Sequence, residues 1–179
     1  MTERITEIMD AGSMQRALKR IAHQILESTK GTDGLLLVGI KRRGVSIARE
    51  LADYIKSFEG TEAQVEVLDA RPYRDDVDRK PPLPESGFEV NGKKIVMVDD
   101  VLYTGRTARA GMDAIIQMGR PAFIKLAVLV DRGHRELPIR ADFVGKNVPT
   151  SREEKVEVCV TEYDGRQGVY LRKNEAWLS

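Results

Sequence analysis

The stretch Val96–Ala108, VMVDDVLYTGRTA, decides how the rest of the chain is interpreted. Its apolar start is typical of a strand that is covered on both faces, as in a parallel sheet, and its end leads into a helix. Asp99 and Asp100 therefore lie where open α/β sheets bind ligands, beyond the carboxyl ends of the strands. Two adjacent carboxylates in that place are unfavourable unless something pairs with them. The stretch thus predicts a binding site at the end of a buried strand.

The turn that follows the two carboxylates predicts a phosphate site. Backbone N–H groups, the hydroxyls of Thr104 and Thr107 and the dipole of the next helix together form a cradle for a phosphate group. The carboxylates suit the 2′- and 3′-hydroxyls of a ribose whose 5′-phosphate occupies the cradle. A P-loop does not explain the turn, because the chain contains no GxxxxGK[ST] sequence. The alternative is a solvent-facing Asp-Asp turn before an ordinary helix.

Apolar spacing on either side of this stretch alternates between strand and helix patterns, which predicts a doubly wound, mostly parallel α/β sheet flanked by helices. We expect Ser13 to cap the first helix and Gly31 to end it. Two apolar runs, 156–163 and 167–172, flank Asp164-Gly165 and predict a C-terminal antiparallel β-hairpin with a tight turn. The expected helices cover 13–29, 44–58 and the residues from Ala108 to Gly119, and the expected strands cover 35–40, 64–68, 95–98 and 123–130.

Length and charge restrict the function further. The chain has 179 residues, which predicts a single domain over 1–179, with a long mobile loop over 70–91 and a second irregular segment over 131–149. Its net charge is +1, so any nucleic-acid binding must use a local basic patch. No apolar run reaches the roughly 20 residues of a membrane helix, and the first residues do not form a signal peptide. We expect a cytoplasmic protein without a membrane partner, in which the single Cys159 is a buried hydrophobe and not a catalytic thiol.

The Val96–Ala108 string resembles the 5-phosphoribosyl-1-pyrophosphate (PRPP) signature of type I phosphoribosyltransferases. The whole chain resembles the PyrR family, pyrimidine-operon regulators that are also uracil phosphoribosyltransferases. Three further segments carry this resemblance: Val38–Gly44 (VGIKRRG), Tyr73–Asp76 (YRDD) and Leu129–Ser151. It implies a type I phosphoribosyltransferase fold and a Mg²⁺-dependent reaction of PRPP with uracil that yields UMP and pyrophosphate. It also implies a homo-oligomer, which binds a pyrimidine-operon mRNA stem-loop under control of UMP or UTP, by transcription attenuation, and does not bind DNA.

The resemblance assigns roles to particular residues. Asp99 and Asp100 are the implied catalytic pair, and the metal is held mainly through substrate oxygens. Residues 39–44 match the pyrophosphate loop, 70–91 the flexible loop that closes over PRPP, and 131–151 the hood over the base. The implied contacts to PRPP or UMP are Asp99, Asp100, Arg42, Arg43, Arg74, Val101, Leu102, Tyr103, Thr104, Gly105, Arg106, Thr107, Arg132 and Val148.

Two basic regions are the candidate RNA contacts. Arg16, Lys19, Arg20 and His23 share one face of the first expected helix, and the second region lies in the hood. The alternative is a solvated helix face beside an ordinary hood, with His134 paired to Glu136. The candidate RNA contacts are Lys19, Arg20, His23, His134, Arg135, Arg140 and Lys146.

Two other functions compete with this interpretation. One is a regulator that senses PRPP or nucleotide and has lost catalysis; the other is a phosphoribosyltransferase for a purine base or orotate. The intact acidic pair argues against the first, and the hood sequence argues against the second.

Overall fold

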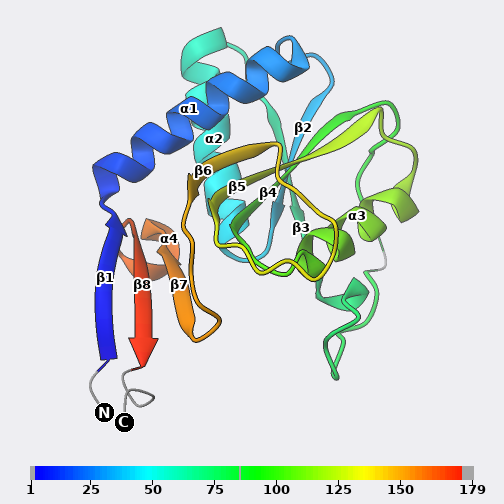
Figure 1. The fold of residues 1–179 in the computed structure, drawn as a ribbon. Helices are drawn as coiled ribbons and strands as arrows, with labels where there is room; N and C mark the ends of the chain where they lie inside the picture. Colours follow the sequence, from blue (N-terminus) through cyan, green and yellow to red (C-terminus); the bar gives the residue numbers. More distant parts are fainter. Residues whose placement is uncertain (1–2, 85, 175–179) are drawn as a thin grey trace.

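A computed structural model describes residues 3–84 and 86–174 of the chain. Its main sheet has five parallel strands in the order β3-β2-β4-β5-β6 (Figure 1). Central β4 lies between β2 and β5, and its carboxyl end carries the acidic pair. The strands are β2 (Leu35–Ile40), β3 (Gln64–Leu68), β4 (Lys94–Leu102), β5 (Phe123–Asp131) and β6 (Phe143–Asn147).

Helices cover both faces of this sheet, which confirms the doubly wound prediction. On one face, α1 (Ala11–Thr29) and α2 (Arg43–Glu59) pack against alternate strand residues such as Leu37 and Val98. On the other face, α3 (Arg106–Met118) packs against the intervening residues, such as Val38 and Met97. Because successive strand residues point to opposite faces, a strand that is apolar throughout fits between two helical layers.

A second, smaller sheet has the order β1-β8-β7 and lies beside the main sheet (Figure 1). Strands β7 (Glu154–Cys159) and β8 (Gly168–Asn174) pair antiparallel, as the hairpin prediction required. The expected tight turn is wrong, because the connection contains a short helix, α4 (Thr161–Asp164). The Asp164 carboxylate accepts from the Val160 N–H at 2.8 Å, which closes this helical turn, and Gly165 ends it with a φ of 66°.

Several other boundaries differ from the sequence-based expectations. Asp10, not Ser13, caps α1: its carboxylate accepts from the Ser13 N–H at 2.7 Å, so the helix begins two residues earlier than expected. Strand β4 continues through the acidic pair to Leu102 instead of ending at Val98. Strand β6 lies within the segment expected to be irregular, where it pairs with β5. A single turn of 3-10 helix, Arg71–Tyr73, begins the loop over 70–91.

Strand β1 (Glu3–Met9) was not expected at all. Most of its residues are exposed, so it lacks the apolar alternation by which strands are recognised. It forms instead by pairing with β8, from Glu3 opposite Asn174 to Met9 opposite Val169. Cys159 is buried, as expected. Among the described residues, no helix is long and apolar enough to cross a bilayer.

Candidate active site

Strand β4 delivers Asp99 and Asp100 to the carboxyl edge of the sheet, where both are half-buried. Each carboxylate accepts the N–H of the following residue, Asp100 at 2.9 Å and Val101 at 2.8 Å. Burial raises the pKa of Asp99 well above its usual range, and the neighbouring Asp100 raises it further. The charge of Arg74 acts in the opposite direction. The edge therefore holds an acidic pair that a cation or hydroxyl donors would stabilise.

The turn after β4 has the geometry of a phosphate cradle. Gly105 has a φ of 93°, a left-handed conformation that favours glycine, and α3 begins at the next residue. The Thr104 hydroxyl accepts from the Arg106 N–H at 3.3 Å. Thr104 and Thr107 line a cavity of about 210 Å³ together with Arg74 and Asp99. Asp99 and the predicted cradle thus share one cavity at the start of a helix, and Asp100 is the next residue of the same strand.

The loop after β2 packs closely against the acidic strand. A Cβ atom on Gly44 would lie 2.5 Å from the Val98 carbonyl oxygen, so only glycine allows this approach. The peptide bond between Lys41 and Arg42 is cis. Arg42 is exposed and lies 5.9 Å from the ring of Tyr163, whereas Arg43 turns away from solvent to form a two-pronged ion pair.

Helix α4 supplies residues that the sequence interpretation missed. Asp164 accepts from Arg43 at 2.8 and 3.2 Å, and Glu162 bonds Ser46 on α2. Arg43 and the Val160 N–H together hold the pKa of Asp164 below its usual range. These acidic residues lie more than a hundred positions from the loop that they hold, so no local pattern links them to it. The only sequence signal for this contact is the opposite charge of the basic residues 41–43 and the acidic residues of 161–164, and that signal is weak by itself.

The hood is bonded directly to the phosphate cradle. The N–H groups of Glu136 and Leu137 donate to the Thr104 carbonyl at 2.9 and 3.2 Å. Arg135 donates to the Tyr103 carbonyl at 2.8 Å and pairs with Asp131. The hood and the cradle therefore form one connected structure.

Arg132 is buried, with its guanidinium 4.0 Å from the centre of the Tyr103 ring. It donates to the carbonyls of Ser151 and Glu154 at 3.0 and 2.7 Å, so its hydrogen bonds hold the end of the hood. Arg132 and Val148 both line a second, larger cavity of about 660 Å³. The structure thus brings these two predicted residues to one cavity, next to the cradle.

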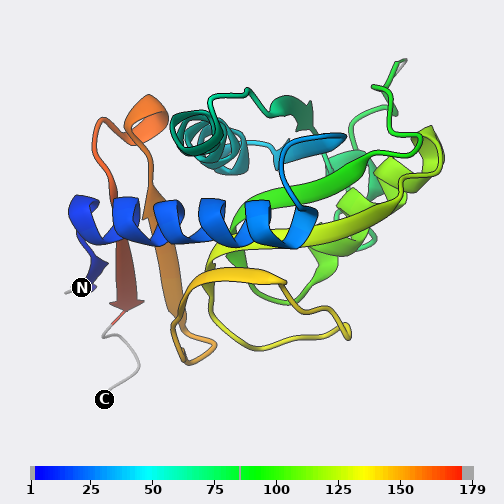
Figure 2. The ribbon, with the colours of Figure 1, turned by 90° about the horizontal axis from the view of Figure 1, so that it is seen from above.

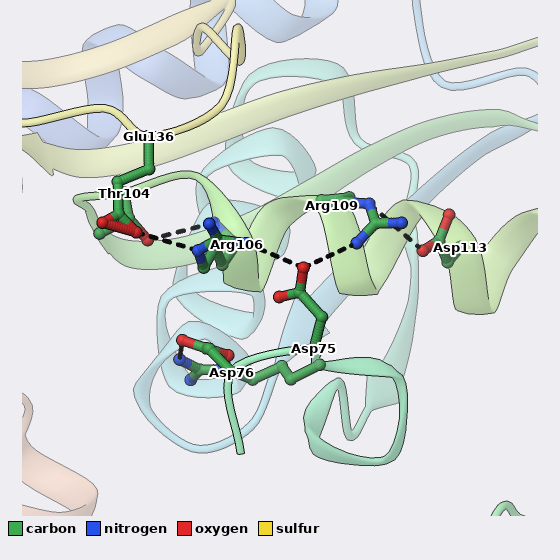
Figure 3. A network of polar contacts seen from close by, with 8 residues as sticks. Asp75, Asp76, Thr104, Arg106, Arg109, Asp113 and Glu136 are labelled. Atoms are coloured by element: carbon green, nitrogen blue, oxygen red, sulfur yellow. Dashed lines mark hydrogen bonds and ion pairs between the residues drawn. The ribbon is translucent and has the colours of Figure 1, made fainter.

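A network of ion pairs joins the flexible loop to the same region (Figure 3). Arg74 pairs with Asp76 at 2.6 Å, while Asp75 pairs with both Arg106 and Arg109. The Arg106 side chain also pairs with Glu136 of the hood at 2.9 Å. Its guanidinium is therefore directed to two carboxylates.

Comparison with known proteins agrees with this geometry. The phosphoribosyl transferase domain family matches residues 4–163. The "Bifunctional protein PyrR" of Thermus aquaticus is 59% identical over 174 residues, covering 94% of this chain and 96% of the relative. The "Pyrimidine operon regulatory protein" of Lactococcus lactis is 48% identical, covering 94% of this chain and 98% of that protein. The chain belongs to the PyrR family.

Solved structures of lower identity share the fold of this PyrR-family chain. A hypoxanthine phosphoribosyltransferase from Trypanosoma cruzi, a mutant form in a ternary complex with substrates, is 20% identical and superposes with a TM-score of 0.76 over 96% of each chain. A hypoxanthine-guanine phosphoribosyltransferase from Bacillus anthracis is 17% identical with a TM-score of 0.72, covering 96% of this chain and 99% of that one. These similarities establish a type I phosphoribosyltransferase fold.

The candidate RNA contacts of this PyrR-family chain fall into two groups. Exposed Lys19, Arg20 and His23 lie on α1, which runs alongside β6 (Figure 2). Lys146, on β6, is also exposed. Arg20 crosses to β6 and donates to the carbonyls of Val144 and Gly145 at 3.0 and 2.5 Å. His23 stacks on Phe58, with ring centres 3.8 Å apart. Arg20 thus ties the basic face of α1 to β6.

The remaining three candidates lie elsewhere in the hood. Arg140 is exposed, whereas the guanidinium of Arg135 is engaged by Asp131 and two carbonyls. His134 contacts the Thr150 carbonyl through Nε2 at 2.5 Å. The alternative pairing of His134 with Glu136 is wrong, because Glu136 pairs with Arg106.

Proposed function

We propose that this chain transfers the ribose 5-phosphate of PRPP to uracil, forming UMP and pyrophosphate. One observation carries the proposal: Asp99, of the half-buried pair Asp99 and Asp100, lines a single cavity together with the helix-start cradle and Arg74. A phosphorylated ribose needs both parts, because its hydroxyls donate to carboxylates while its phosphate accepts from N–H and hydroxyl groups.

In the proposed reaction, the C1–O bond to pyrophosphate breaks and a bond forms between C1 and N1 of uracil, which loses its proton. Positive charge develops on the ribose as the bond breaks, and Asp99 and Asp100 lie where they can stabilise it. Asp100 is also our candidate acceptor of the uracil proton. The pyrophosphate would be held at residues 39–44, where the close packing of Gly44 on β4 keeps the loop beside the acidic pair.

The acidic pair fits a magnesium ion that takes most of its ligands from the substrate. Among the described residues there is no group of three or more His, Cys, Asp or Glu side chains placed to hold a metal ion. Mg²⁺ commonly binds through one or two carboxylates together with substrate phosphates and water. When bound, it would neutralise charge on the leaving pyrophosphate. Asp99 and Asp100 would hold it, because a cation would offset the repulsion between these two adjacent carboxylates.

We place the uracil in the cavity of about 660 Å³ under the hood. Backbone groups near Val148 and Pro149 would read the edges of the base, and the buried Arg132 would hold the hood in position through its two carbonyl contacts. A small planar base requires fixed donors and acceptors, and a hood bonded to the cradle meets that need.

The names of the relatives support a second role, which we propose for this chain as well: UMP- or UTP-dependent binding of a pyrimidine-operon mRNA stem-loop, leading to transcription attenuation. The basic residues of α1 and β6 are the proposed RNA contacts. Because the net charge of the whole chain is only +1, the attraction to RNA phosphates must come from such local groups of basic residues. We also expect a homo-oligomer.

Turnover assays with PRPP and Mg²⁺, and with uracil, hypoxanthine or orotate in turn, test the enzymatic proposal. We expect UMP with uracil only. If product forms only with hypoxanthine or only with orotate, that base and not uracil is the substrate. If no base gives product, the chain is a regulator without catalysis. A gel shift with the pyrimidine leader RNA tests the second role, and binding no tighter than that of scrambled RNA would refute it.

A further inference from the structure

Arg106 occupies an unexpected place for a residue at the start of the phosphate-binding helix. The resemblance predicts a substrate contact there, yet its side chain extends to two carboxylates from other segments (Figure 3). Its Nη1 atom lies 2.8 Å from Asp75 and its Nε atom 2.9 Å from Glu136. One guanidinium thus joins the first helical turn of α3, the base of the 70–91 loop and the hood.

The contact with the loop is reinforced by a second arginine. Arg109, one turn further along α3, approaches the same oxygen of Asp75 at 3.1 Å. Two cationic groups on a rigid helix therefore hold one carboxylate of an otherwise irregular segment. An isolated surface ion pair contributes little free energy, whereas several charges in one network contribute more. The two arginines together can therefore hold the loop in position.

Asp75 directly follows Arg74, and Arg74 lines the cavity that contains Asp99. Arg74 is itself oriented by Asp76 through bonds of 2.8 and 2.6 Å. The position of Arg74 relative to the acidic pair therefore depends on where the segment 74–76 is held. Asp75 connects this segment to α3 through its ion pairs with Arg106 and Arg109.

We propose that Arg106 is a positioning residue that clamps the base of the 70–91 loop to the hood and so holds Arg74 beside the acidic pair. This inference rests on the proposed transferase function. The clamp acts through Asp75 and Glu136, not through a contact of the Arg106 side chain with substrate. Its role is to keep the loop in place over the phosphorylated sugar, which excludes water from the reacting bond.

The test compares four single variants and one double variant with the wild-type chain. Arg106→Gln breaks both contacts, Asp75→Asn weakens the loop contact and Glu136→Gln weakens the hood contact. Glu62→Gln is the matched control, because Glu62 forms an exposed ion pair with Lys56 at 2.6 Å that joins neither the loop nor the hood. Melting temperatures within a few degrees of the wild type establish that each variant is folded.

Two measurements are made on every variant. The first is amide hydrogen exchange over residues 73–80 without substrate. The second is the KM for PRPP and the kcat with saturating uracil. We expect Arg106→Gln to accelerate exchange and to raise the KM for PRPP about fivefold or more, since one exposed ion pair alone shifts an equilibrium by up to roughly fivefold. Asp75→Asn and Glu136→Gln should each show a smaller effect in the same direction, and the control Glu62→Gln should show none.

The double variant Asp75→Asn with Arg106→Gln should be little worse than Arg106→Gln alone, because both changes break the same contact. A raised KM with unchanged exchange, and no effect of Asp75→Asn or Glu136→Gln, would overturn the proposal in favour of direct phosphate binding by Arg106. If the wild type has no turnover, the proposed function fails, whereas hydrogen exchange still decides the clamp: unchanged exchange in Arg106→Gln refutes it.

Discussion

Replacing Gly44 by alanine tests whether the close packing of the 39–44 loop on β4 sets the position of the acidic pair. The added Cβ would lie 2.5 Å from the Val98 carbonyl oxygen and 3.2 Å from the Asp99 Cα. Both are backbone atoms of the central strand, so no side-chain rotation can relieve the contact. Ordinary contact begins at 3.4 Å, and the separation from the oxygen must therefore grow by about 0.9 Å.

That displacement must move either the start of α2 or the end of β4. In both cases the loop that we assign to pyrophosphate moves relative to Asp99. A misplacement of about 1 Å can lower the rate of an enzymatic reaction by roughly 100-fold. Overpacking of this kind costs about 1–3 kcal/mol of stability, which for a chain of this size lowers the melting temperature by about 2–12 °C. We thus expect a folded protein with a large loss of kcat/KM.

The assay is steady-state turnover with PRPP and uracil, beside a thermal melt of the same preparation. Gly12→Ala is the control, because Gly12 lies in α1, away from the site, and its added Cβ would first meet the end of the flexible Arg16 side chain, at 3.3 Å. That variant should keep full activity and equal or greater stability, since alanine favours a helix over glycine. Activity of Gly44→Ala within about threefold of the wild type would refute the reasoning, because the expected loss is roughly 100-fold.

Three further predictions follow from the same contacts. Asp99→Asn should abolish turnover, and it should raise the melting temperature at pH 7.5 but not near pH 3. The raised pKa of Asp99 means that its charged form destabilises the folded state, and this penalty disappears as the pH falls below the unfolded pKa of about 3.9. A lower melting temperature of the variant at pH 7.5 would contradict this. Asp164→Asn should lower the melting temperature at neutral pH, with a difference that shrinks as the pH falls through the depressed pKa of Asp164; an equal loss at every pH would show that the ion pair with Arg43 is not its source. Lys146→Ala should reduce the salt dependence of RNA binding by about one unit of slope with turnover unchanged, which gel shifts over a salt series would measure; an unaltered slope would remove Lys146 from the RNA contacts.

Much of the fold followed from local patterns. The apolar run before Asp99, and the similar run of β2, predicted strands covered on both faces, and α1, α2 and α3 do cover them. The acidic pair and the Thr104–Thr107 turn were expected to lie together, and Asp99 does share a cavity with Thr104 and Thr107. These features depend on residues close in sequence, whose periodicity and turn chemistry act over a few positions.

Other elements formed only through partners that the local sequence does not reveal. Exposed β1 has no apolar pattern and exists because β8 supplies its hydrogen bonds. Strand β6 is short and lies in a segment rich in proline and charge, where pairing with β5 overrides local preference.

The sequence by itself therefore determined the α/β class, the family and the presence of an acid-tipped strand before a phosphate-binding turn. Only the tertiary structure decided that Arg43 is held by Asp164, that Arg106 joins Asp75 to Glu136, and that Arg20 ties α1 to β6. The reason is physical: periodicity and turn preference are properties of neighbouring residues, whereas an ion pair forms between whichever charged groups the packing of distant segments brings within reach.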